Sequence, residues 1–126
     1  MDDKKIILAV DDMPTNLQIL QSLLSDEFSV RLAKSGHMAL SALTRIRADL
    51  ILLDIEMPGL SGFDVMNELQ KNPDTRDIPV IFVTAHATRE VIARAAKAGA
   101  KDYLVKPFDP QALREKIWRV LGANLA

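Results

Sequence analysis

Five short runs of Ile, Leu and Val, separated by longer stretches with helical spacing, constrain the fold of this 126-residue chain more than any other feature. The runs cover residues 5–10, 28–33, 49–53, 79–83 and 101–105. Most are apolar nearly throughout, which is typical of a strand covered on both faces. In residues 28–33 the polar Ser29 and Arg31 alternate with apolar residues, which predicts an edge strand.

The stretches between and after these runs predict helices over residues 14–25, 36–47, 63–71, 87–98 and 110–121. Pro14 stands in a first turn, and Ser35 and Asp109 stand where a helix N-cap is expected. Gly99 and Gly122 stand where a helix ends in a left-handed cap. Repeated strand–helix units with right-handed crossovers therefore predict an α/β fold, a doubly wound parallel sheet of five strands with five helices.

Composition excludes several classes of protein. The chain has 16 Lys and Arg against 17 Asp and Glu, a net charge of −1, so it carries no basic footprint for nucleic acid. It has no cysteine, which excludes disulfides, thiolate metal sites and a cysteine nucleophile. The apolar runs are far shorter than the ~20 residues that span a bilayer, and no signal peptide precedes the first run. We expect one cytoplasmic domain, residues 1–126, that contacts neither nucleic acid nor membrane.

Polar side chains follow four of the five predicted strands. Asp11 and Asp12 follow the first, Asp54 the third, Thr84 the fourth and Lys106 the fifth. In an open α/β sheet, ligands bind in the crevice beyond the carboxyl ends of the strands. We therefore expect three carboxylates, one hydroxyl and one ammonium to converge on one rim of the sheet.

The chemistry of this set suits a divalent cation and a phosphoryl group. Clustered carboxylates repel one another, and an all-oxygen ligand set without His or Cys favours Mg²⁺. An ammonium and a hydroxyl beside the metal could clamp the oxygens of a transferring phosphoryl group. A carboxylate is also a competent covalent nucleophile, forming an acyl phosphate. Asp54 is the central candidate, since its strand is expected between those of Asp11/Asp12 and Thr84.

Taken in order, these motifs resemble a response-regulator receiver domain, the phosphoacceptor module of two-component signalling. The similarity extends from about Ile6 to about Leu121. Its motifs are Asp11-Asp12, Leu52-Leu53-Asp54-Ile55-Glu56-Met57-Pro58-Gly59 with Gly62, Val83-Thr84-Ala85 and Val105-Lys106-Pro107-Phe108. The resemblance implies the strand order 2-1-3-4-5 of that fold and a cis Lys106–Pro107 bond. The residues to which it gives structural roles are Pro58, Gly59, Gly62 and Pro107.

By this resemblance, Asp54 accepts a phosphoryl group from a phosphohistidine on a histidine kinase or a histidine phosphotransfer protein. Asp12 and Asp54 would bind Mg²⁺ directly, with Mn²⁺ able to substitute, and Asp11 would bind it through water. The backbone carbonyl of Glu56 would complete the protein ligands. Lys106 would pair with the phosphoryl oxygens. The chain would catalyse only its own phosphorylation and dephosphorylation.

The same resemblance implies a switch. The amide of Ala85 would help to cradle the phosphoryl group, Thr84 would move toward it, and Tyr103 would turn inward. A downstream protein would then bind the face formed by the fourth helix, fifth strand and fifth helix. The chain itself would be a monomer or a phosphorylation-dependent dimer. Glu56 and His86 stand at positions that tune dephosphorylation.

Simpler interpretations stand beside these. Asp12 could cap the helix that follows it, and Trp118 would serve packing or an interaction face rather than report metal binding. A haloacid-dehalogenase-like phosphatase would want a second aspartate where this chain has Glu56. A flavodoxin-like electron carrier needs a loop that binds the FMN phosphate after the first strand, and there Asp11-Asp12 would repel that phosphate. A receiver-like interaction module that is never phosphorylated is the third alternative.

Overall fold

One five-stranded parallel sheet, in the order β2-β1-β3-β4-β5, organises the computed structural model, which describes residues 4–125. The expected strand order is therefore confirmed, and the alternating run of residues 28–33 does lie at an edge. The strands are β1 (Ile6–Val10), β2 (Ser29–Ala33), β3 (Leu50–Asp54), β4 (Val80–Thr84) and β5 (Asp102–Val105).

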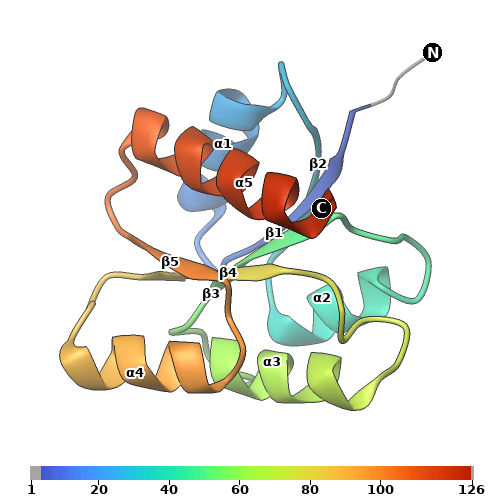
Figure 1. Ribbon diagram of the computed structural model, residues 1–126, viewed down its shortest axis with the longest axis vertical. Helices are drawn as coiled ribbons and strands as arrows, with labels where there is room; N and C mark the ends of the chain where they lie inside the picture. Colours follow the sequence, from blue (N-terminus) through green and yellow to red (C-terminus); the bar gives the residue numbers. More distant parts are fainter. Residues whose placement is uncertain (1–3, 126) are drawn as a thin grey trace.

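Helices cover both faces of the sheet (Figure 1). Helices α1 (Pro14–Leu24) and α5 (Pro110–Leu125) lie on one face. Helices α2 (Gly36–Ala42), α3 (Gly62–Lys71) and α4 (Arg89–Lys97) lie on the other. Within residues 4–125, no helix is both long and apolar enough to cross a membrane.

Some predicted helix ends were wrong. Helix α2 ends at Ala42 rather than at residue 47, because the Thr44 hydroxyl donates to the Ser41 carbonyl at 2.6 Å and tightens the chain into a turn. Helix α4 begins after Thr88, whose Oγ1 accepts a hydrogen bond from the Val91 amide. Helix α5 continues through Gly122, whereas Gly99 does have a left-handed φ of 101°.

The apolar core forms two layers, one on each side of the sheet. Successive residues of a strand point to opposite faces, so Ile7 and Ala9 pack with α1 and α5, while Leu8 and Val10 pack with the other helices. Every residue of β3 and β4 is buried. Coverage on both faces is the reason these strands are apolar up to their last residues, Asp54 and Thr84.

The strand register brings the carboxyl ends level. Val10 pairs with Leu53, Asp54 with Val83, and Thr84 with Val105. The residues that follow or end these strands therefore meet at one rim of the sheet. The register therefore brings the side chains at and just beyond these strand ends close together.

Gly62 packs directly against the backbone at the end of β3. Its amide donates to the Ile55 carbonyl at 2.8 Å, so α3 begins directly against the chain that leaves β3. A Cβ atom on Gly62 would lie 2.4 Å from the Asp54 carbonyl oxygen and 2.8 Å from the Ile55 Cα. Backbone atoms cannot move aside as a flexible side chain can, so only glycine fits without displacing Asp54.

We expect Gly62→Ala to lower the free energy of unfolding by about 1–3 kcal/mol, as overpacking usually does. Gly122→Ala is the matched control: no atom lies within 4 Å of its added Cβ, and alanine favours a helix over glycine by up to about 1 kcal/mol. Urea unfolding of both variants measures the difference. Equal effects of the two substitutions would contradict the close approach of Gly62 to β3.

Candidate functional site

Three carboxylates meet at the rim. One oxygen each from Asp11, Asp12 and Asp54 lies within 4.8 Å of the others. Asp11 and Asp54 are only 1% and 2% exposed, whereas Asp12 is partly exposed. Since like charges at this separation repel, a hard divalent cation with oxygen ligands fits the cluster.

The Lys106 ammonium bridges two of these carboxylates. Its Nζ lies 2.9 Å from Asp11 Oδ2 and 3.2 Å from Asp54 Oδ1. Its amide donates to the Thr84 carbonyl, and the bond to Pro107 is cis, as expected. One ammonium against three ionised carboxylates leaves two negative charges, which again matches a divalent ion.

Burial and neighbouring charges shift the pKa values of Asp54 and Lys106. Burial raises the pKa of Asp54 from 3.8 to about 6; the Asp11 charge adds to the rise and Lys106 opposes it. Burial alone would lower the pKa of Lys106, but its hydrogen bond to Asp11 and the charges of Asp54 and Asp11 outweigh burial, and the net shift is upward. Asp54 thus carries a charge that the fold disfavours.

Asp11 is held rigidly. Its Oδ1 accepts from the Met13 amide at 2.9 Å, and its Oδ2 accepts from Asn16 Nδ2 at 3.1 Å as well as from Lys106. Asn16 was missed by the sequence analysis; the available signal was a polar side chain in the first turn of the helix after the acidic pair. Asp12 does not cap this helix, whose N-cap is Met13 without a side-chain hydrogen bond.

Thr84 takes part in a second hydrogen-bonded group beside the cluster. Its Oγ1 donates to Glu56 Oε1 at 3.2 Å and accepts from the His86 amide at 3.0 Å. The His86 imidazole Nε2 lies 3.5 Å from Glu56 Oε2, with both side chains at least half exposed. Ala85, between Thr84 and His86, is exposed. The contact between Glu56 and Thr84 was also missed by sequence reasoning.

The remaining predicted residues lie farther out. Tyr103 is half-buried on β5, where its ring packs against the apolar layer that includes α4. The Lys116 ammonium lies 4.7 Å from the centre of that ring and donates to the Tyr103 carbonyl. Pro58 and Gly59 form an exposed turn after β3, in which Gly59 has a φ of 75°.

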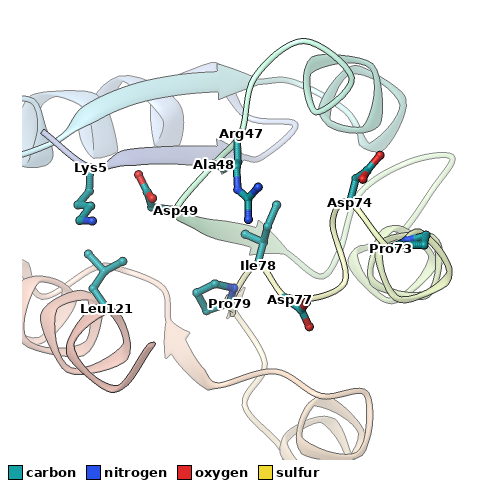
Figure 2. Close-up of a pocket in the computed structure, with 10 residues that line it drawn as sticks. All are labelled: Lys5, Arg47, Ala48, Asp49, Pro73, Asp74, Asp77, Ile78, Pro79 and Leu121. Atoms are coloured by element: carbon teal, nitrogen blue, oxygen red, sulfur yellow. The ribbon is translucent and has the colours of Figure 1, made fainter. Parts of the chain in front are cut away.

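A separate cavity of about 260 Å³ lies at the amino ends of the strands, opposite the carboxylate cluster (Figure 2). It is lined by residues that include Lys5, Arg47, Asp49, Asp74 and Asp77, from segments that lead into β1, β3 and β4. One strand of this sheet spans about 16 Å, which separates this cavity from the carboxylate cluster. Its mixed charges form no set of converging acids or nucleophiles.

Comparison with known proteins gives a consistent result. The family description "Response regulator receiver domain" matches residues 7–118. The chain is 39% identical over 111 residues to a probable cyclic di-GMP phosphodiesterase of Vibrio cholerae, covering 88% of this chain and 25% of that protein. It is 38% identical over 116 residues to the chemotaxis protein CheY of Pseudomonas aeruginosa, covering 90% and 94%.

Solved structures agree. The receiver domain of a sensor histidine kinase from Pseudomonas aeruginosa, with a magnesium ion coordinated in its active-site cleft, matches with a TM-score of 0.86 and 32% identity. That match covers 94% of this chain and 98% of the other. The chain spans only about a quarter of the length of the first curated relatives that it matches.

The raised pKa of Asp54 gives a pH-dependent stability. Because folding raises this pKa from 3.8 to about 6, the contribution of Asp54 to stability is greatest below about pH 4 and is lost as the pH rises through 6. In metal-free protein at pH 7.5, we expect the free energy of unfolding of Asp54→Asn to exceed that of the unmodified protein by up to about 3 kcal/mol.

The gain should shrink toward pH 4, where Asp54 is protonated in the folded protein. Urea unfolding in chelator at the two pH values measures it, with Glu68→Gln on the exposed surface of α3 as control. A gain that is the same at both pH values would contradict the raised pKa.

Asn16 fixes an Asp11 oxygen, so its loss should weaken binding of a metal at the cluster. We expect Asn16→Ala to lower Mg²⁺ affinity about tenfold, as changes to residues that orient metal ligands commonly do. Titration calorimetry measures the affinity, and Asn67→Ala on the exposed side of α3 is the control. Unchanged affinity in Asn16→Ala would show that Met13 and Lys106 suffice to orient Asp11.

Proposed function

Because the chain belongs to the response-regulator receiver family, we propose that Asp54 accepts a phosphoryl group from the phosphohistidine of a histidine kinase or histidine phosphotransfer protein. The observation that carries this proposal is a buried carboxylate, Asp54, within 3.2 Å of the Lys106 ammonium and beside two further carboxylates. Burial excludes bulk water from the oxygen that would become phosphorylated, while the ammonium supplies positive charge.

The transfer is a displacement at phosphorus. An Asp54 oxygen attacks, the P–O bond forms, and the P–N bond to the histidine breaks. The electron pair of that bond goes to the histidine nitrogen, which leaves as neutral imidazole when the other ring nitrogen carries a proton. The product is an acyl phosphate on Asp54 and an unmodified histidine on the donor.

The carboxylate cluster supports a Mg²⁺ requirement, and Mn²⁺ would substitute. We assign Asp12 and Asp54 as direct ligands, Asp11 as a ligand through water, and the Glu56 backbone carbonyl as the remaining protein ligand. The bound ion supplies positive charge to the oxygens of the transferring phosphoryl group. The rigid Asp11, which has both oxygens hydrogen-bonded, suits an outer position.

The remaining groups hold the product. Lys106 keeps its place beside Asp54 and exchanges part of its interaction with the carboxylate for the phosphoryl oxygens. The Ala85 amide cradles the same oxygens, and the Thr84 hydroxyl donates to them. Pro107, which follows Lys106 in the chain, has a structural role. Glu56 and His86 tune the lifetime of the acyl phosphate.

The signal leaves through β5. Thr84 lies beside Val105 of β5 in the sheet, and as Thr84 moves toward Asp54 the half-buried Tyr103 ring turns inward. A downstream protein then binds the surface of α4, β5 and α5. Val105 is 45% exposed on this surface, which suits a protein contact.

Intact-mass spectrometry after incubation with acetyl phosphate and Mg²⁺ tests the proposal. We expect one phosphoryl adduct, absent in Asp54→Asn and in the presence of chelator, and retained in Asp74→Asn. No adduct on the folded protein would favour the interaction module that is never phosphorylated. Continuous release of inorganic phosphate from many donors would favour a phosphatase.

A further inference from the structure

We propose that Glu56 is a positioning residue that engages the Thr84 hydroxyl in the unphosphorylated protein, so that a phosphoryl group on Asp54 must compete with Glu56 for the single hydroxyl proton of Thr84. The inference rests on the proposed function, because it concerns how Thr84 is recruited after Asp54 is phosphorylated. It assigns a definite partner to the Glu56 side chain in the unphosphorylated protein.

The hydrogen-bonding capacity of Thr84 carries the argument. A threonine hydroxyl has one proton to donate. In this structure that proton is given to Glu56 Oε1 at 3.2 Å, while the oxygen accepts from the His86 amide at 3.0 Å. Thr84 is only 1% exposed, so little solvent reaches its hydroxyl while Glu56 and His86 are in place. Donating to a phosphoryl oxygen therefore requires the bond to Glu56 to break.

The backbone places Glu56 within reach. Pairing between β3 and β4 continues one residue past Asp54, since the Ile55 amide donates to the Val83 carbonyl at 3.0 Å. Glu56 is the next residue, and it therefore leaves the sheet beside Thr84. The contact joins residues 28 positions apart and follows directly from the register.

The neighbouring His86 reinforces the arrangement mainly through its backbone. The hydrogen bond from its backbone amide orients the Thr84 hydroxyl oxygen, so the hydroxyl proton is directed toward Glu56. The imidazole lies 3.5 Å from Glu56, but it is 71% exposed, and exposed ion pairs contribute little. The bond between Thr84 and Glu56 is the interaction that must exchange.

The size of the effect follows from the strength of such a bond. A net hydrogen bond changes an equilibrium by about three- to tenfold, and Glu56 is half exposed, which limits the gain. We expect Glu56→Ala to bind beryllofluoride with Mg²⁺, a stable mimic of the acyl phosphate, about three- to tenfold more tightly than the unmodified protein. Glu56→Gln, which keeps an acceptor oxygen, should gain less.

Removal of the Glu56 charge could also strengthen anion binding without any role for Thr84, and a double-mutant cycle separates the two effects. The same Glu56 substitutions are made together with Thr84→Ala, and beryllofluoride affinity is measured by calorimetry. We expect the gain from Glu56→Ala to shrink in the Thr84→Ala background. Glu68→Ala, equally exposed on α3, should leave the affinity unchanged.

A spectroscopic readout reports on the hydroxyl directly. The His86 amide donates to Thr84, so its NMR shift should move in Glu56→Ala toward the shift seen with beryllofluoride bound. An equal affinity gain in both Thr84 backgrounds, with no movement of this signal, would overturn the positioning role and leave phosphorylation of Asp54 intact. Absence of beryllofluoride binding by the unmodified protein would overturn both proposals.

Discussion

The ion pairs from the Lys106 ammonium to Asp11 and Asp54 tie together the carboxyl ends of β1, β3 and β5. Without this cation, two nearly buried ionised carboxylates side by side would repel each other strongly, which favours protonation of one of them. Lys106 compensates only partly for burial and for the repulsion between the carboxylates. Burial and Asp11 therefore raise the pKa of Asp54 to about 6 against the opposing effect of Lys106. The rim is folded, but its charge is not balanced.

The uncompensated negative charge at this rim is central to the proposed function. A site with excess negative charge and oxygen ligands favours a divalent ion. The buried carboxylate beside an ammonium is the observation on which the proposed phosphoryl transfer rests. Two further side chains contact residues of this site: Asn16, in the first turn of α1, and Glu56, in the loop after β3. Asn16 holds Asp11, and Glu56 holds Thr84, so each acts on the site through a residue of the site.

Much of the fold was predictable because burial on both faces leaves a plain trace in the sequence. The five strands, the edge position of β2 and the convergence of Asp11, Asp12, Asp54 and Lys106 are confirmed. The ends of α2 and α5 were not predictable from local signals. The Thr44 hydroxyl competes for a carbonyl in one case, and Gly122 stays helical in the other.

Local pattern alone determined which segments become strands and which polar residues follow them, since strand periodicity and helix signals act over a few neighbouring residues. Only the tertiary structure decided what those polar residues touch. The bond between Asn16 and Asp11 depends on how α1 leaves β1, and the bond between Thr84 and Glu56 joins residues 28 positions apart. Such contacts depend on strand register and loop direction, because hydrogen bonds require atoms within about 3 Å.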